Sequence, residues 1–174
     1  MEGFAIWLTG IPASGKSTIA RNLSRRLRRR GLRIQVLESD RLRRILTPNP
    51  KYTEDERNFF YGVMVYIGSL LARNGVNVIF DATAHKRKYR REARKMIRKF
   101  LEVYVECPIE VCRRRDRKNL YKLAELGKIT TLPGLQVPYE EPLNPDVRVN
   151  TALETVDGCV EKIIRKLRDR KFLH

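Results

Sequence analysis

Short apolar runs alternate along this chain with longer segments in which apolar residues recur at helical spacing. The runs are rich in β-branched and aromatic residues and predict strands at 4–9, 33–37, 76–80, 101–106 and 147–149. The intervening segments predict helices at 16–30, 53–74, 86–99, about 108–116 and 156–170. Strands that alternate with helices favour an α/β fold with a parallel sheet. We therefore expect one α/β domain over residues 1–174, with a five-stranded parallel sheet flanked by helices.

Local end signals support two of these helices. Thr53 and Glu56 have the spacing of a capping box, in which each residue satisfies a free backbone N–H of the first turn. Gly31 and Gly75 follow the last periodic residues of two helices, where a left-handed residue commonly ends a helix. These signals predict where the first and second long helices end and where the second begins.

The segment 117–145 interrupts the pattern. Its glycines and prolines are Gly127, Pro133, Gly134, Pro138, Pro142 and Pro145. A long stretch without regular structure in a compact domain is often a lid over a ligand site, although a solvated loop has a similar composition. We expect a mobile lid here.

Composition narrows the protein class. Hydrophobic residues make up 42% of the chain, which argues against disorder, and no apolar run is long enough to span a membrane. The first residues run directly into a strand, so no leader peptide is expected. Cys107, Cys112 and Cys159 lack metal-binding spacing, and we expect buried, reduced thiols and a cytoplasmic location.

The chain is strongly basic, with 37 Lys and Arg against 20 Asp and Glu, a net charge of +17. Such a charge suits nucleic acid, an anionic nucleotide or a thermophile's charged helix surfaces. The basic residues cluster in predicted helices, at 21–30 and 86–99, without interleaved aromatic residues. A nucleic-acid partner is therefore not expected.

A phosphate-binding motif lies between the first strand and the first helix. Residues 10–17 read G-I-P-A-S-G-K-S and match G-x-x-x-x-G-K-[ST] in the context that this motif requires. Glycines let the backbone N–H groups wrap around phosphate oxygens at a helix N-terminus. Lys16 is expected to reach the β- and γ-phosphates, and the Ser17 hydroxyl to bind Mg²⁺. The expected nucleotide contacts are Gly10, Ile11, Pro12, Ala13, Ser14, Gly15, Lys16, Ser17 and Thr18.

This motif and the strand–helix alternation together predict a three-layer P-loop NTPase fold. A GTPase would also need a base-reading N-K-x-D motif, which the chain lacks. A chain of 174 residues leaves little room for the switch regions of larger NTPases. A small kinase that uses ATP is the favoured class.

Acidic residues follow two predicted strands, at the sheet edge where ligands bind in open α/β folds. Asp40 comes after the second strand and is our candidate for the general base, with a helix N-cap as the alternative. Asp81 follows the third strand and is either a Mg²⁺ residue or a cap for the next turn. Glu38 could share either role with Asp40.

Several longer stretches resemble the adenylylsulfate kinase family, which phosphorylates adenosine 5′-phosphosulfate (APS) on its 3′-hydroxyl with ATP. They are the P-loop, Leu37–Arg43, Tyr52–Asn58, Val105–Cys112, the R-D-x-K-x-L-Y-K run at 115–122 and the P-Y-E-x-P-x-x-P run at 138–145. The last two runs are distinctive of that family, and the resemblance covers nearly the whole chain.

The resemblance implies roles at the matching positions. Asp40 would be the base, and Lys16 would stabilise the transferred phosphoryl group. Arg43 and Arg57 would hold the phosphosulfate, with Tyr52 stacked on the adenine of APS. Arg115 and the lid would close over the nucleotide. The family is often dimeric, which makes a homodimer an open possibility.

Three departures from the family pattern concern the acceptor site and the lid. Phe60 stands where the family usually has Asn, and Thr130 and Leu132 stand where its lid has Lys and Phe. Leu132 could still cover an adenine through apolar contact. The family's S-P-[YF]-R segment is A-H-K-R at 84–87. The run Asp81-Ala82-Thr83 also resembles kinases of aminoacyl-tRNA or polynucleotide ends, which keeps another acceptor open as the alternative.

Overall fold

The computed structural model describes residues 1–173 and contains one parallel five-stranded sheet in the order β2-β3-β1-β4-β5. The strands are β1 (Ala5–Thr9), β2 (Ile34–Glu38), β3 (Asn77–Asp81), β4 (Phe100–Glu106) and β5 (Val147–Asn150). Every neighbouring pair is parallel, so all five carboxyl ends lie at one edge. Because β1 lies between β3 and β4, the chain leaves β1 at the switch point where such folds bind ligands.

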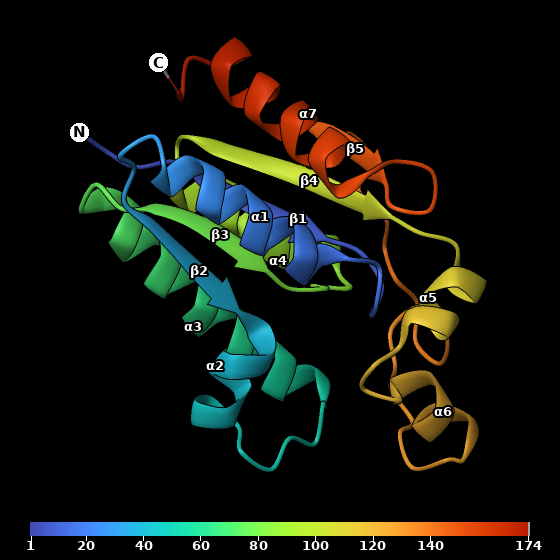
Figure 1. The fold of residues 1–174 in the computed structure, drawn as a ribbon. Helices are drawn as coiled ribbons and strands as arrows, with labels where there is room; N and C mark the ends of the chain where they lie inside the picture. Colours follow the sequence, from blue (N-terminus) through green and yellow to red (C-terminus); the bar gives the residue numbers. More distant parts are fainter. Residues whose placement is uncertain (174) are drawn as a thin grey trace.

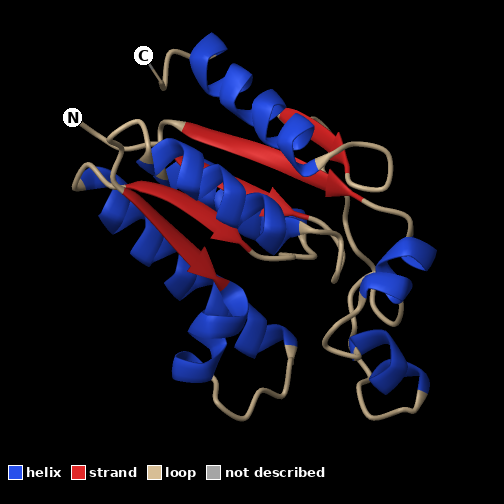
Figure 2. Cartoon of the chain, viewed as in Figure 1, coloured by secondary structure: helices blue, strands red, loops and turns tan. Residues whose placement is uncertain are grey.

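Helices cover both faces of the sheet (Figures 1 and 2). The helices are α1 (Lys16–Arg28), α2 (Ser39–Leu46), α3 (Glu54–Arg73), α4 (Arg87–Met96), α5 (Ile109–Arg115), α6 (Leu120–Glu125) and α7 (Val156–Asp169). α1 and α7 share one core with the sheet, whereas α3 and α4 share the core on its other face. The predicted three-layer α/β fold is confirmed.

The core beneath α3 is aromatic. Trp7 of β1 stacks on Phe80 of β3 with 4.5 Å between ring centroids. α3 approaches this pair at Gly68, where an added Cβ would lie 2.2 Å from the Phe80 ring. This close contact fixes α3 against the sheet, and the N-terminal half of α3 therefore projects toward the carboxyl edge.

The sequence prediction was wrong in two segments and imprecise in a third. α2 and α6 were not predicted, because both are short and α2 has no fully buried residue. Part of the segment expected to lack regular structure is therefore helical. The basic helix ends at Met96 rather than at 99, since Ile97 is already extended and β4 begins at Phe100.

The buried thiols are confirmed and the capping box is confirmed in one half, since the Glu56 carboxylate accepts from the N–H groups of Lys51 and Tyr52 rather than from that of Thr53. Thr53 caps α3 by accepting a hydrogen bond from the Glu56 N–H, and Gly75 follows α3 in the left-handed region with φ +76°. All three cysteines are buried and free. Among residues 1–173, no helix combines the length and the apolar character needed to cross a membrane.

Candidate active site

The P-loop joins β1 to α1 and is pressed against β4. An added Cβ at Gly10 would lie 2.4 Å from the Val105 carbonyl oxygen, so only glycine fits there. Gly15, with φ +99°, begins α1 in a left-handed conformation that glycine adopts without strain. The Lys16 Nζ lies over the loop and donates to the carbonyls of Gly10 at 2.9 Å and Ile11 at 3.0 Å. The loop therefore has the shape and the cation of a phosphate cradle.

Residues far along the chain hold this loop from outside. The Thr151 hydroxyl donates to the Ser14 carbonyl at 2.7 Å, and the Tyr121 hydroxyl donates to the Pro12 carbonyl at 2.8 Å. Arg115 donates to the Thr151 carbonyl at 3.1 Å and therefore lies near the loop. The Ser14 Oγ is buried and has no hydrogen-bond partner among residues 1–173.

Asp81 ends β3 directly beside the P-loop and is 6% exposed. Burial raises the pKa of the Asp81 carboxyl, whereas the Lys16 ammonium and the Ser17 hydroxyl oppose that shift. Burial likewise lowers the pKa of Lys16, and the Asp81 carboxylate opposes it. The two groups thus stabilise each other's charged form. Carboxylate and hydroxyl oxygens side by side are donors that suit Mg²⁺.

Asp40 lies in the first turn of α2 and not in a loop. It forms an ion pair with Lys118, which reaches across from the segment between α5 and α6. The negative charge of Asp40 acts on both groups: it opposes the lowering of the Lys16 pKa by burial and adds to the raised pKa of Asp81. The three groups therefore belong to one site. The N-cap alternative is wrong, because Glu38 occupies the cap position of α2.

Arg43 is held by aromatic rings. Its guanidinium carbon lies 3.8 Å from the centroid of the Phe60 ring and 4.9 Å from that of Tyr52. The Arg43 Nη1 is buried and has no hydrogen-bond partner among residues 1–173. A cation–π contact orients a guanidinium without neutralising it. Arg43 therefore presents a positive charge and a free donor, which fits an anionic ligand.

Arg57 is 8% exposed and contacts the lid. Its Nη2 donates to the Thr131 carbonyl at 2.9 Å, and its guanidinium carbon lies 5.5 Å from the Tyr52 ring centroid. Leu132, next to Thr131, is buried in a separate apolar cluster with Cys112, Tyr121 and Ala124. The structure thus brings Arg43, Tyr52 and Arg57 together, with the lid backbone beside them.

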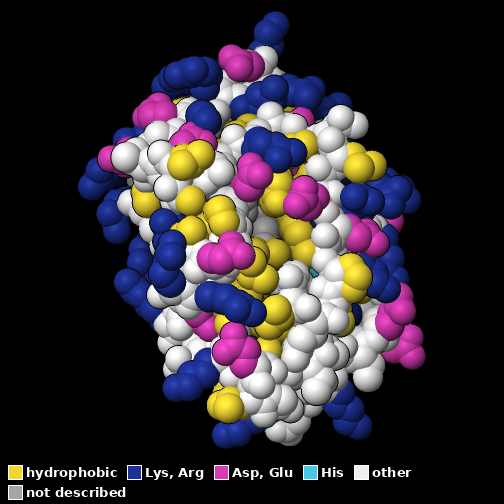
Figure 3. All heavy atoms as spheres, turned by 90° about the vertical axis from the view of Figure 1, so that its right-hand side faces the viewer, with side chains coloured by type: hydrophobic (Ala, Val, Ile, Leu, Met, Phe, Trp, Pro, Cys, Tyr) yellow, Lys and Arg dark blue, Asp and Glu magenta, His cyan; other side chains and the backbone are white. Residues whose placement is uncertain are grey.

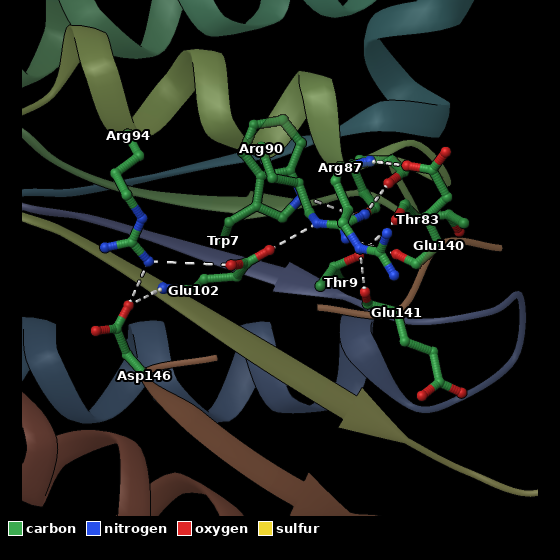
Figure 4. A network of polar contacts seen from close by, with 12 residues as sticks. Trp7, Thr9, Thr83, Arg87, Arg90, Arg94, Glu102, Glu140, Glu141 and Asp146 are labelled. Carbon is green, nitrogen blue, oxygen red and sulfur yellow. Dashed lines mark hydrogen bonds and ion pairs between the residues drawn. The ribbon is translucent and has the colours of Figure 1, made fainter. Parts of the chain in front are cut away.

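Tyr139 is a structural residue of the site edge that sequence reasoning missed. It joins a polar network of which Figure 4 labels Thr9, Thr83, Arg90 and Glu140. Its hydroxyl lies 2.8 Å from the Thr9 Oγ1, and Thr9 donates to the Thr83 carbonyl at 2.6 Å. Arg90, 1% exposed, donates to the Glu140 carbonyl at 2.6 Å. The P-Y-E-x-P-x-x-P run at 138–145 was a recognisable signal, but the sequence does not show that it contacts Thr9 of β1.

The carboxyl edge of the sheet is hollowed. Figure 3 looks onto this edge and shows hydrophobic side chains in a central hollow, surrounded by basic and acidic ones. A cavity of about 630 Å³ opens between Ile11 of the P-loop, the end of β4 and residues 134–139 of the lid. Its volume is that of a small-molecule site.

His85 is buried at this edge, and its titration makes the stability of the protein depend on pH. Burial lowers the pKa of His85 to about 4, and the positive charges of Arg57 and Lys86 add to this shift. The unfolded chain takes up this proton near pH 6.5, whereas the folded protein resists it until about pH 4. Titration of His85 should therefore lower the free energy of unfolding by at most about 3 kcal/mol as the pH falls from 6.5 to 4.

The measurement compares the wild type with His85→Asn, which cannot titrate. The free energy of unfolding of each protein is obtained from urea denaturation at pH 7 and pH 4.5. Relative to the variant, the wild type should be less stable at pH 4.5 than at pH 7. A difference between the two proteins that does not change with pH would contradict this assignment.

The sheet order, the G-x-x-x-x-G-K-S loop on the switch point, and the acidic groups beside it define a P-loop kinase. The sequence pattern of the adenylylsulphate kinase family matches residues 2–150, most of the chain. The chain belongs to the adenylylsulphate kinase family.

Individual relatives agree with this membership. The chain is 40% identical to a probable adenylyl-sulfate kinase of Pyrococcus abyssi, in an alignment of 173 residues that covers 99% of each protein. It is 40% identical to the adenylyl-sulfate kinase of Rippkaea orientalis, over 99% of this chain and 95% of that one. The structure resembles that of the Mycobacterium tuberculosis APS kinase CysC in complex with AMPPNP and APS, with a TM-score of 0.90, 32% identity, and coverage of 96% and 98%.

Proposed function

We propose that this protein transfers the γ-phosphoryl group of ATP to the 3′-hydroxyl of APS. The main observation in favour of this substrate is that Arg43 and Arg57 both lie against the Tyr52 ring. Their guanidinium carbons are 4.9 and 5.5 Å from its centroid. Two guanidiniums suit a compact phosphosulfate anion, and a tyrosine ring suits an adenine. Family membership and the APS and AMPPNP in the Mycobacterium tuberculosis relative support the same assignment.

Lys16 and the P-loop N–H groups bind the phosphates of ATP in this proposal. Lys16 would exchange its contacts with the Gly10 and Ile11 carbonyls for phosphate oxygens. Ser17 and Asp81 would hold Mg²⁺, which neutralises the developing charge on the β- and γ-phosphates. The remaining P-loop residues and Arg115 would contact the nucleotide.

Asp40 acts as the general base in this proposal. A neutral hydroxyl is a weak nucleophile, and a carboxylate within reach takes its proton as the bond to phosphorus forms. Lys118 pairs with Asp40 and contributes to the electrostatic field at Lys16, so it would orient the carboxylate between the two substrates. Residues 117–145 would form the lid, which keeps water from ATP when it closes. The Leu132 side chain is buried in the lid's own apolar cluster, so it would cover the acceptor only after the lid rearranges.

The test is to incubate the purified protein with Mg-ATP and a panel of acceptors, and to identify the phosphorylated product by mass spectrometry. The panel contains APS, adenosine 5′-phosphate, an aminoacyl-tRNA and a polynucleotide with a free end. We expect 3′-phosphorylated APS as the product. Turnover of another acceptor with APS left unchanged would overturn the substrate, although not the kinase class.

Arg57→Ala should chiefly weaken acceptor binding. It removes one of the two guanidiniums and leaves the P-loop untouched, so the KM for APS should rise about tenfold or more while the KM for ATP changes little. Steady-state kinetics with each substrate varied in turn measure this. Arg73→Ala, at the far end of the same helix, is the control. Equal increases in both KM values for Arg57→Ala would show that Arg57 does not belong to the acceptor site.

A further inference from the structure

The edge of the sheet opposite the active site, where the amino ends of the strands lie, is strongly basic. Helices α1 and α7 end there, at the opposite end of the molecule from α5 and α6 (Figure 1). Residues 3–37 carry eight Lys and Arg and no Asp or Glu. Four of these cations are exposed where α1 ends and β2 begins: Arg28, Arg29, Arg30 and Arg33. No acid of the same segment compensates their charge.

A hollow of about 820 Å³ at the same edge is also lined by cations. Among residues 1–173 its lining contains one carboxylate, that of Glu2, and five cations: Arg73, Arg94, Lys95, Arg98 and Lys99. Backbone contacts connect the hollow to the arginines at the end of α1. The Arg33 carbonyl accepts from the Asn77 N–H at 2.9 Å, and the Asn77 Oδ1 accepts from the Phe4 N–H at 3.0 Å. Because Phe4 closely follows Glu2 of the hollow, the two groups of cations belong to one surface.

The end of α7 extends this surface with three exposed cations, Arg168, Arg170 and Lys171. Arg170 pairs with Asp146 at 3.0 Å, and Arg94 of α4 pairs with the same carboxylate at 2.6 Å. Cations from the two faces of the sheet thus meet at its amino edge. We call the three groups together the basic pole: the four arginines at the end of α1, the five cations of the hollow and the three at the end of α7.

Ion pairs leave most of the basic pole uncompensated. Within residues 1–173, eight of its twelve cations form no ion pair, and the exceptions are Arg94, Lys95, Arg98 and Arg170. A helix C-terminus favours cations, but this effect falls off within the last turn and does not account for cations at the starts of strands. The ion-pair networks of thermophile proteins would pair these cations with acids. The remaining charge therefore fits an external polyanion.

The chemistry of the basic pole favours the phosphates of a nucleic acid. Nine of its twelve cations are arginines, whose planar guanidiniums can bind a phosphate through two parallel hydrogen bonds. None of the residues within 1–173 that line the hollow is aromatic, which disfavours single strands held by base stacking. A membrane surface would need apolar anchors beside the charge, and the apolar side chains of this lining are two methionines, Met1 and Met96.

We propose that the basic pole binds the phosphate backbone of a nucleic acid duplex without reading its sequence. Such contacts neutralise phosphates and release their counterions, so they need clustered cations but no base-reading side chain. The sequence did not predict this partner, because the cations come from separate segments that only the fold brings together. The proposal does not depend on the acceptor of the kinase, since the P-loop lies at the opposite edge of the sheet.

The first experiment measures binding of the full chain to a labelled RNA duplex of about 20 base pairs by fluorescence anisotropy. Saturating Mg-ATP is present, so that the P-loop is occupied and cannot bind the probe. We expect a Kd in the micromolar range at about 50 mM salt. The logarithm of the association constant should fall with the logarithm of the salt concentration with a slope of roughly −5, as for about six neutralised phosphates.

Charge reversal tests whether the basic pole is the binding surface. The double variant R29E/R30E should weaken duplex binding about tenfold or more and make the salt dependence less steep, because fewer phosphates are neutralised. The double variant R73E/R98E, in the hollow, should have the same effect, since both groups of cations belong to one surface. Circular dichroism checks that each variant is folded.

The matched control is R44E/R114E, which lowers the net charge by the same amount at exposed residues of α2 and α5, beside the carboxyl edge. It should bind the duplex within a few-fold of the wild type. A wild type that does not bind the duplex at about 100 µM protein and about 50 mM salt would overturn the proposal. Pole variants that lose no more affinity than the control would overturn it too, as would binding to phosphatidylserine vesicles with none to the duplex.

Discussion

Replacing Lys16 with alanine is expected to reduce turnover by about 10³-fold or more. The Lys16 Nζ lies over the P-loop within 3.0 Å of the Gly10 and Ile11 carbonyls, so its ammonium is placed to meet the β- and γ-phosphates that the loop is proposed to hold. In the variant no other lysine reaches that position from the loop, and the charge that develops on the phosphoryl group loses its nearest side-chain cation. Coupled measurement of ADP release at saturating APS gives the rate.

The control for this variant is Lys95→Ala. Lys95 is 73% exposed and, within residues 1–173, pairs only with Glu92 on α4, so its loss should leave turnover unchanged. Thermal unfolding of both variants shows whether the fold persists. If folded Lys16→Ala protein keeps turnover within a few-fold of the wild type, the P-loop of this chain is not its catalytic phosphate site.

Asp40→Asn should lower kcat by about 10²-fold or more while the KM for APS changes little. The amide keeps the shape of the carboxylate but cannot accept the proton of the 3′-hydroxyl, so the loss falls on the chemical step. The variant also removes the ion pair with Lys118, in which both side chains are more than half exposed. A surface pair of this kind contributes little to stability, and the folded protein should remain intact.

Asp157→Asn is the matched control, since Asp157 is an exposed acid at the start of α7 that pairs with Arg26 of α1. Steady-state kinetics and single-turnover mixing separate binding from chemistry. A rise in KM for APS without a fall in kcat would make Asp40 a binding residue and exclude it as the base. A variant indistinguishable from the wild type would exclude both roles.

Local patterns were sufficient for the parts of the fold that depend on local physics. The P-loop is a continuous motif whose glycines, lysine and serine act within one turn of chain, so the sequence alone located it. The buried strands are apolar runs, and α3 carries its own cap at Thr53. α2 escaped prediction because it is only eight residues long and none of its residues is fully buried.

The candidate site depends instead on contacts between distant residues. Lys118 meets Asp40 across 78 positions, and Tyr139 meets Thr9 across 130. Phe60 was recognisable as a departure from a family pattern, but its place beneath the Arg43 guanidinium follows from the packing of α2 on α3. No periodicity or spacing encodes these pairings, since the sheet order decides which chain segments meet.

If Arg57 binds the acceptor as proposed, the acceptor competes with the lid backbone for the Nη2 hydrogen that Arg57 now donates to the Thr131 carbonyl. A pose of the anion that uses this hydrogen is open only in molecules where the bond is broken, so its observed affinity equals the intrinsic affinity multiplied by the fraction of such molecules. The same exchange frees the Thr131 segment at the moment the acceptor arrives. Under the proposed assignment, acceptor entry and lid rearrangement would be one coupled equilibrium, and a substitution at residue 131 should change the apparent affinity for the acceptor without touching the ligand.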